Sequence, residues 1–166
     1  MANLTNGSGL SSYDPSAGHT RIGQSWIGTA KTGFFDFNLN GLFSVTQIAV
    51  WNAPFGVSQY SLAASTDGVT YTPISGFPVL LTNPSTNDLE TFAEIQKFSP
   101  VVASNIRMTL LDGYSASNNT ALREVMFAGD PATMVTVPEP GIPSMAALGL
   151  AAIFMVRARY RNRSAH

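Results

Sequence analysis

Residues 60–74 read YSLAASTDGVTYTPI. Within this stretch the runs YSLAAS (60–65) and VTYTPI (69–74) flank Thr66, Asp67 and Gly68. An Asp-Gly pair between two runs of this kind is a strong signal for a β-hairpin, because glycine supplies the positive φ that a tight turn requires. We therefore predict two antiparallel strands joined at Asp67 and Gly68.

Similar runs lie on both sides of this hairpin. Residues 34–39 and 45–51 are β-branched and aromatic and are joined by Asn40 and Gly41. Residues 105–112 alternate between apolar and polar, and residues 122–128 follow after a loop. Residues 88–98 fit either a strand or a short helix. With no other helical period before residue 140, the body is predicted to be all-β, an antiparallel β-sandwich or jelly roll.

The composition fits an exported β-protein. Of the 166 residues 45% are hydrophobic but only 11% are charged, against ~25% in ordinary soluble domains. There is no cysteine, which excludes a disulfide framework and a thiol nucleophile. Five basic and nine acidic side chains precede Pro138, and this acidic balance argues against nucleic acid as a partner. Residues 1–25 are predicted to be a polar, partly ordered segment, and they lack the charged start and apolar core of a secretory signal. If the protein is exported, a leader upstream of Met1 is expected.

The C-terminal region has a different character. Prolines favour an extended linker over residues 130–141. The sixteen residues 141–156 carry no charge; as a helix they would span about 24 Å, somewhat short of a ~30 Å hydrocarbon core. Because residues 145–156 are apolar on every side, a membrane helix fits better than a helix packed on the body. We expect a transmembrane helix over residues 142–157 and a basic cytoplasmic tail over residues 158–166.

Four arginines directly after the apolar run favour retention of this end in the cytoplasm, with the body outside; they are Arg157, Arg159, Arg161 and Arg163. A polybasic anchor for nucleic acid would not explain the apolar run that precedes them. The chain would then be anchored in the inner membrane with its N-terminal domain in the periplasm.

The order of these parts resembles a known sorting signal. A Pro-Glu-Pro motif, an apolar segment and an Arg-rich end resemble the PEP-CTERM signal of exopolysaccharide-producing Gram-negative bacteria, a tail also called the ice-binding protein C-terminal domain; the motif residues are Val137, Pro138, Glu139 and Pro140. The resemblance covers about thirty residues, although the family often has an unbroken basic run. It implies cleavage near the motif by exosortase, a membrane-embedded cysteine transpeptidase, and passage to the cell surface. A permanent single-pass anchor is the alternative.

The body resembles discoidin-type, galactose-binding-like jelly rolls. The segments FFDFNLNGLFSVTQIAVWNAP (34–54), SQYSLAASTDGVTYTPI (58–74) and ASNIRMTLLDGYSASNNTALREVMF (103–127) follow the order of elements in that family. The resemblance covers residues 26–128, and we place the domain at residues 26–129. Relatives bind sugars or lipid head groups through loops at one end, and many hold a structural calcium. It implies a non-catalytic body, with exopolysaccharide or another glycan as a candidate ligand and a purely structural role as the alternative.

The resemblance also suggests a calcium site. Glu124 stands where carbohydrate-binding relatives place a calcium-ligating carboxylate, and Asp14 is the acid of the N-terminal loop that could join it. A calcium ion takes six or more oxygen ligands. The alternative is that Glu124 pairs with Arg123 or Arg107, or is solvated.

A sugar site needs an exposed aromatic ring beside amide and carboxylate groups. The loop after residue 111 offers such a set, although Tyr114 fits equally well as an ordinary loop aromatic; the candidates are Asp112, Tyr114, Asn118 and Asn119. Trp26 and Trp51 are expected in the core.

Support for catalysis is weak. The two histidines are His19 and His166, and no nucleophile elbow is present. We therefore predict that the protein is not an enzyme.

Overall fold

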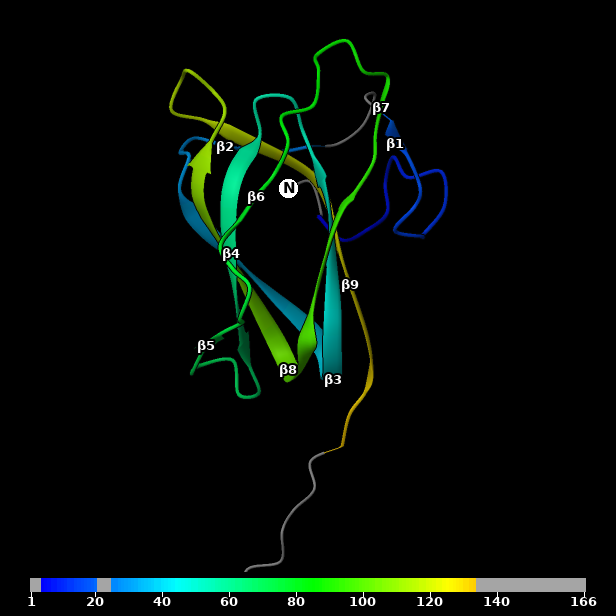
Figure 1. Cartoon of the computed structure of the whole chain (residues 1–166), viewed down its shortest axis with the longest axis vertical. Coiled ribbons are helices and arrows are strands. Elements are labelled where there is room, and N and C mark those ends of the chain that lie inside the picture. The colour runs from blue at the N-terminus through cyan, green and yellow to red at the C-terminus, as the bar shows by residue number, and fades with distance from the viewer. Residues whose placement is uncertain (1–3, 21–24, 134–166) are drawn as a thin grey trace, which may run out of the picture. The chain divides into compact units, whose positions relative to one another are not determined.

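The computed structural model describes residues 4–20 and 25–133 (Figure 1). Within these residues every regular element is a strand, and all strand pairs are antiparallel. The strands are β1 (His19–Thr20), β2 (Trp26–Gly28), β3 (Gly33–Asn52), β4 (Val57–Ser65), β5 (Thr72–Pro73), β6 (Val79–Leu80), β7 (Glu90–Thr91), β8 (Glu94–Gly113) and β9 (Thr120–Pro131). The predicted all-β antiparallel sandwich is confirmed.

The described residues all belong to one compact unit, Met1–Thr133. The sorting motif at residues 137–140, the predicted helix over residues 142–157 and the basic tail over residues 158–166 lie outside the described residues. Among residues 4–20 and 25–133, no helix is long and apolar enough to cross a membrane.

Two long strands, β3 and β8, each contribute to both layers of the sandwich. Residues 33–38 of β3 pair with residues 105–110 of β8, which also pair with β4. Residues 43–50 of β3 pair with residues 94–103 of β8 on one side and with β9 on the other. One layer therefore holds the first half of β3, the second half of β8 and strands β4, β5 and β6. The other holds the remaining halves with β9 and β2 (Figure 1).

The bend in β3 lies where its register with β8 shifts, between Asn38 and Phe43. Asn40 has a φ of 57°, and its N–H donates to Oδ1 of Asn38 at 2.8 Å. Asparagine tolerates this left-handed conformation because its short polar side chain can bond locally. The two runs predicted at residues 34–39 and 45–51 are therefore halves of one bent strand.

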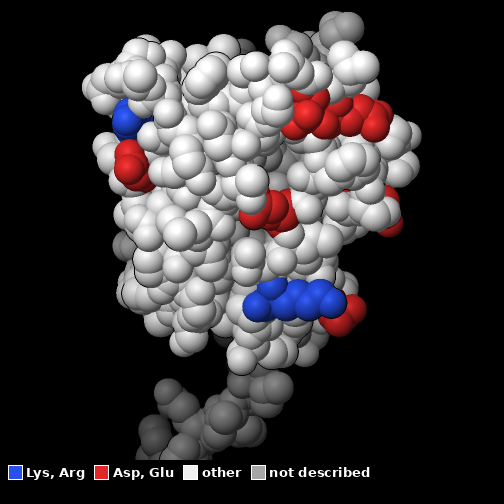
Figure 2. Space-filling view, turned by 45° about the horizontal axis from the view of Figure 1, so that its top comes forward, with Lys and Arg blue, Asp and Glu red and all other residues white. Residues whose placement is uncertain are grey.

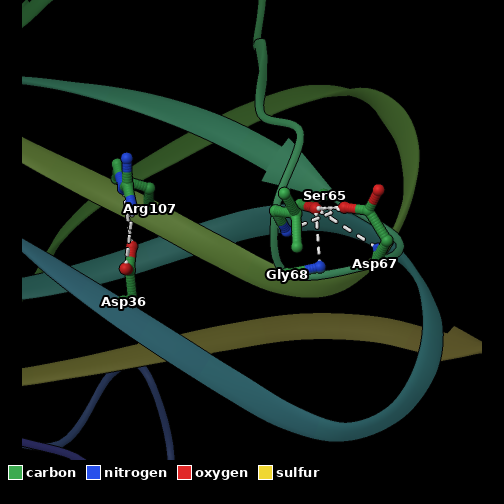
Figure 3. Close-up of polar contacts among 6 residues, drawn as sticks. Asp36, Ser65, Asp67, Gly68 and Arg107 are labelled. Carbon is green, nitrogen blue, oxygen red and sulfur yellow. Dashed lines mark hydrogen bonds and ion pairs between the residues drawn. The ribbon is translucent and has the colours of Figure 1, made fainter.

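The hairpin predicted at Asp67 and Gly68 is present, but its second strand is short. Gly68 has a φ of 73°, and β5 pairs with β4 only through Pro73 and Thr72. Before β5, the Asp67 carboxylate accepts hydrogen bonds from the N–H groups of residues 69 and 70 at 2.8 Å (the turn is drawn in Figure 3). These N–H groups bond to a side chain instead of a neighbouring strand, so the ladder starts only at Thr72.

The core lies between the two layers. The predicted alternation in residues 105–112 is confirmed, because Ile106, Met108 and Leu110 are buried and Arg107 lies on the opposite face. Trp51 is fully buried and donates from Nε1 to the carbonyl of Ala17 at 2.8 Å. Of the two alternatives for residues 88–98, the strand is confirmed by β7 and the start of β8.

The N-terminal residues pack onto the sandwich. Leu4 is buried in the core cluster, and its carbonyl accepts a hydrogen bond from the Val125 N–H at 2.8 Å. His19 and Thr20 pair with β7 as a small second sheet. Residues 4–20 therefore help to close one side of the body even though their composition is polar.

Candidate functional site

Two loops meet at one end of the sandwich, at the top of Figure 1. The β3–β4 loop (53–56), the β8–β9 loop (114–119) and strand β2 surround a pocket of about 420 Å³, which we call the loop-end pocket. Its volume lies within the range of ordinary small-ligand sites, about 300–1,000 Å³. The lining residues are Ile27, Pro54, Phe55, Ser115, Ala116, Ser117, Asn119, Thr120 and Ala121.

Asn52, at the end of β3, organises the β3–β4 loop from below. Its side chain is buried, its Nδ2 donates to the carbonyls of Val57 and Thr82 at 2.8 and 2.9 Å, and its Oδ1 accepts from the N–H groups of Ala53 and Val57 at 3.1 Å. One amide therefore satisfies four backbone groups from three segments, which is the full bonding capacity of two donors and two acceptor positions.

Phe55 projects from the loop held by Asn52. It has a φ of 57° and a side chain that is 54% exposed, and its N–H donates to Oδ1 of Asn83 at 3.0 Å. A non-glycine residue in this conformation is strained and is typical of functional loops. At Gly56 any side chain would lie within 2.3–2.6 Å of Asn52 Oδ1 and of the Ala53 and Ala121 carbonyls. The backbone is therefore packed tightly directly behind the exposed ring.

The pocket is also lined by polar side chains, and three of them form hydrogen bonds with one another. Oδ1 of Asn119 accepts from the hydroxyls of Ser115 and Ser117, the latter at 2.8 Å, and the two serine hydroxyls lie 2.8 Å apart. Thr120 also lines the pocket, and its buried hydroxyl has no hydrogen-bond partner among the described residues. Leaving such a group unsatisfied costs about 1–3 kcal/mol. A water molecule or a ligand hydroxyl that reached it would recover part of that energy.

Of the four residues predicted for a sugar, only Asn119 lines the loop-end pocket. Tyr114 is partly exposed, and its hydroxyl donates to the Leu81 carbonyl. The Asp112 carboxylate accepts from the Gly113 N–H at 2.8 Å, and Asn118 is an exposed loop residue.

The sequence analysis missed Phe55 and Ile27. Their only local signal was the Pro54-Phe55-Gly56 turn and an apolar residue near the start of a strand. Nothing local indicated that β2 would bring Ile27 next to the β8–β9 loop, since this depends on its pairing with Ala121 of β9.

The two residues predicted to bind calcium each have another hydrogen-bonding role. The Asp14 carboxylate accepts from the N–H and hydroxyl of Ser16, which lowers its pKa. Glu124 is buried and accepts from the Gly7 N–H at 3.0 Å, and burial raises its pKa. Within residues 4–20 and 25–133, no group of three or more His, Asp or Glu residues could hold a metal ion. Two carboxylates do not complete a calcium shell of six to eight oxygens, so the calcium site stays a prediction.

The alternative pairing of Glu124 with an arginine is not what the structure has. Arg107 binds Asp36 through two hydrogen bonds of 2.7 and 2.8 Å (Figure 3) and lies over the rings of Phe34 and Tyr71. Arg123 is buried elsewhere and donates to Oγ1 of Thr91 at 2.6 Å. The Glu124 carboxylate therefore holds the N-terminal segment at Gly7.

A larger groove of about 750 Å³ lies along the side of the sandwich, between the first half of β3 and β9. Its rings pack against one another, with centroid distances of 4.6 Å for Trp26–Phe35 and 5.2 Å for Phe37–Phe127. These side chains also pack against the core cluster. Tyr13 also lines this groove and is 67% exposed. We prefer the loop-end pocket because it joins an exposed ring on a strained loop, Phe55, with hydroxyl groups and an amide that line the same pocket.

No protein-family model matches the chain, and no curated protein matches it. Solved structures match it in fold. A family 89 glycoside hydrolase from Clostridium perfringens, in complex with its substrate GlcNAc-alpha-1,4-galactose, matches with a TM-score of 0.52 and 18% identity over 78% of this chain. The chain spans only 12% of that enzyme's length.

Isolated modules match over most of their length. The CBM32-3 module of a family 31 glycoside hydrolase from Clostridium perfringens has a TM-score of 0.52 and 17% identity, over 64% of this chain and 76% of the module. The CBM32 of AlyQ, in complex with 4,5-unsaturated mannuronic acid, has a TM-score of 0.50 and 17% identity, over 77% of this chain and 98% of that one. At these identities the similarity shows that the body has the fold of carbohydrate-binding modules.

Proposed function

We propose that the body of this protein is a non-catalytic carbohydrate-binding domain that holds a glycan in the loop-end pocket. The observation that carries the proposal is the arrangement around Phe55. An exposed ring, kept in a strained backbone conformation by Asn52 and Asn83, lines the same pocket as two serine hydroxyls and an amide. A sugar has an apolar face that packs on a ring and hydroxyls that hydrogen-bond at its edge.

The fold supports this role without deciding the ligand. Structures of similar fold include a module of a glycoside hydrolase, the CBM32 of AlyQ in complex with 4,5-unsaturated mannuronic acid, and a whole glycoside hydrolase in complex with its substrate GlcNAc-alpha-1,4-galactose. One of these ligands is neutral and the other is acidic. The ligand class for this chain therefore has to be argued from its own pocket.

Glycan binding can be tested on the full chain in a detergent without a sugar head group, with a glycan array followed by calorimetry on the best ligand. Phe55→Ala should weaken binding at least about tenfold, since it removes the stacking surface. The matched control is Phe92→Ala, because Phe92 is also a well-exposed ring but does not line the pocket. Equal affinities of wild type and Phe55→Ala would contradict the assignment of the site.

The C-terminal region supports a second part of the proposal. The Pro-Glu-Pro motif, the uncharged sixteen-residue run and the four arginines support export, anchoring in the inner membrane and processing by an exosortase-type enzyme. The processed body would then bind exopolysaccharide or another glycan at the cell surface or in the matrix. A permanently anchored protein with a structural β-domain is the alternative.

Mass spectrometry of the protein recovered from the cell surface distinguishes these two fates. Processing predicts a chain that ends close to Pro140 and lacks all four tail arginines. Replacement of Glu139 by Ala should then leave the full-length form in the membrane fraction. A surface protein that retains its Arg-rich end would instead support the permanent anchor.

A further inference from the structure

Among the described residues, none that lines the loop-end pocket is charged. Its polar groups come from Ser115, Ser117, Asn119 and Thr120, and the remaining lining residues are apolar. Ser115, Ser117 and Asn119 already form hydrogen bonds with one another. These hydroxyl and amide groups offer a ligand both hydrogen-bond donors and acceptors but no net charge. A carboxylate or sulfate in this pocket would lose its hydration without gaining a positively charged partner.

No basic side chain among the described residues lines the pocket. The described residues contain nine acidic side chains and four basic ones. Of the basic ones, Arg107 is neutralised by Asp36, Arg123 is buried beside Thr91, and Lys31 and Lys97 do not line the pocket. In the view of Figure 2 most of the surface is uncharged, and several acidic side chains lie together at the upper right. The net negative field repels anionic polymers over a distance of about 8–10 Å at ordinary salt.

The apolar walls further restrict the ligand. Two large apolar side chains line the pocket and are exposed: Ile27 is 69% exposed and Phe55 is 54% exposed. Together with Pro54, Ala116 and Ala121 they form a surface that gains energy only from an apolar ligand face. A neutral sugar ring, with its C–H groups on one side, provides such a face.

We infer that the loop-end pocket selects neutral sugars and rejects uronic acids and sulfated sugars. This inference rests on the proposed carbohydrate-binding function and adds the ligand class to it. It also predicts the salt dependence. Binding of a neutral sugar to an uncharged pocket should not change with ionic strength, because no counterions are displaced and no charge pair is screened.

The test compares matched pairs of ligands that differ only at C6, such as methyl galactoside with methyl galacturonide and methyl glucoside with methyl glucuronide. Affinities are measured on the detergent-solubilised full chain at about 50 and about 500 mM NaCl. We expect the neutral member of a bound pair to bind at least about tenfold more tightly. We also expect its affinity to change by less than about twofold between the two salt concentrations.

A charge-gain variant makes the test independent of absolute affinity. Ala116→Lys introduces a cation at the pocket wall and should raise the affinity for the uronide at least about fivefold at low salt, with loss of the gain at high salt. The control is Val69→Lys, because Val69 is 82% exposed and outside the pocket. This variant adds the same charge and should leave the neutral-to-acidic ratio unchanged.

The outcomes separate the two proposals. Uronides that bind as tightly as their neutral partners, or an Ala116→Lys variant that behaves as Val69→Lys does, would overturn the inference on ligand class and leave carbohydrate binding intact. Absence of binding to any neutral or acidic glycan would overturn the proposed function and the inference with it.

Discussion

Replacement of Asn52 by Ala should destabilise the body more than any change at its exposed loops. The side chain makes four hydrogen bonds of 2.8–3.1 Å, all to backbone groups, and is 2% exposed. With a net contribution of about 1 kcal/mol per bond, the free energy of unfolding should fall by about 3–4 kcal/mol. That is a large share of a total stability of about 5–15 kcal/mol.

A second substitution separates the two hydrogen bonds that the Asn52 side chain donates from the two that it accepts. Asn52→Asp keeps the oxygen that accepts from Ala53 and Val57 but loses the donor to the carbonyls of Val57 and Thr82, and it places an acidic group against those carbonyls. It should therefore be at least as destabilising as Asn52→Ala above neutral pH, since a buried carboxylate without a cation is costly. Asn83→Ala is the control, because it removes one bond at an exposed position and should cost about 1 kcal/mol or less.

Urea denaturation of the full chain, followed by tryptophan fluorescence, measures these effects, because Trp51 is fully buried and reports on the core. The glycan affinity of Asn52→Ala should fall as well, since the loop that carries Phe55 loses its support. A loss of stability below about 1 kcal/mol for Asn52→Ala would refute the view that this amide organises the loop.

Three further predictions concern the turn, the N-terminal segment and the Tyr114 hydroxyl. Hydrogen bonds from the residue 69 and 70 N–H groups and from Ser65 hold the pKa of Asp67 at about 2. The stability that the Asp67 carboxylate contributes should therefore be lost as the pH falls from about 3.8 to about 2. In acid unfolding, Asp67→Ala should not show this loss of stability. Burial lowers the pKa of His19. The unfolded chain therefore binds a proton at His19 more readily, and the stability of the fold should decrease as the pH drops below about 6.5. In thermal melts, the melting temperature of His19→Gln should depend less on pH over this range. Tyr114→Phe removes the bond to the Leu81 carbonyl and should cost about 1 kcal/mol in urea unfolding; an unchanged midpoint would show that this bond contributes nothing.

Local patterns in the chain were sufficient to predict most strands and one hairpin. The alternation of Ile106, Met108 and Leu110 marks a half-buried strand wherever it occurs, and the turn at Asp67 and Gly68 is made by bonds between residues at most three apart. The predictions were wrong about the lengths of two strands. The strand after this turn is short because the Asp67 carboxylate takes the N–H groups that a ladder would use, and β3 is continuous because Asn40 accommodates a bend.

The candidate site was much harder to predict. Asn119 was predicted because its loop places amides beside an aromatic ring and a carboxylate. Tyr114 and Asp112, chosen for the same reason, bond to the protein's own backbone. Phe55 carries no signal of exposure in its local sequence, since its position depends on the buried amide of Asn52 and on the tight packing around Gly56.

The amino-acid sequence by itself determined that the body consists of antiparallel strands, because alternation and turn chemistry act between near neighbours along the chain. Only the tertiary structure decided which residues share a pocket. Ile27, Phe55 and Asn119 are far apart in the chain and meet because β2 pairs with β9 and two loops end at the same edge of the sandwich. Such meetings depend on strand register and layer packing, which are set by the free energy of the whole fold and not by any one segment.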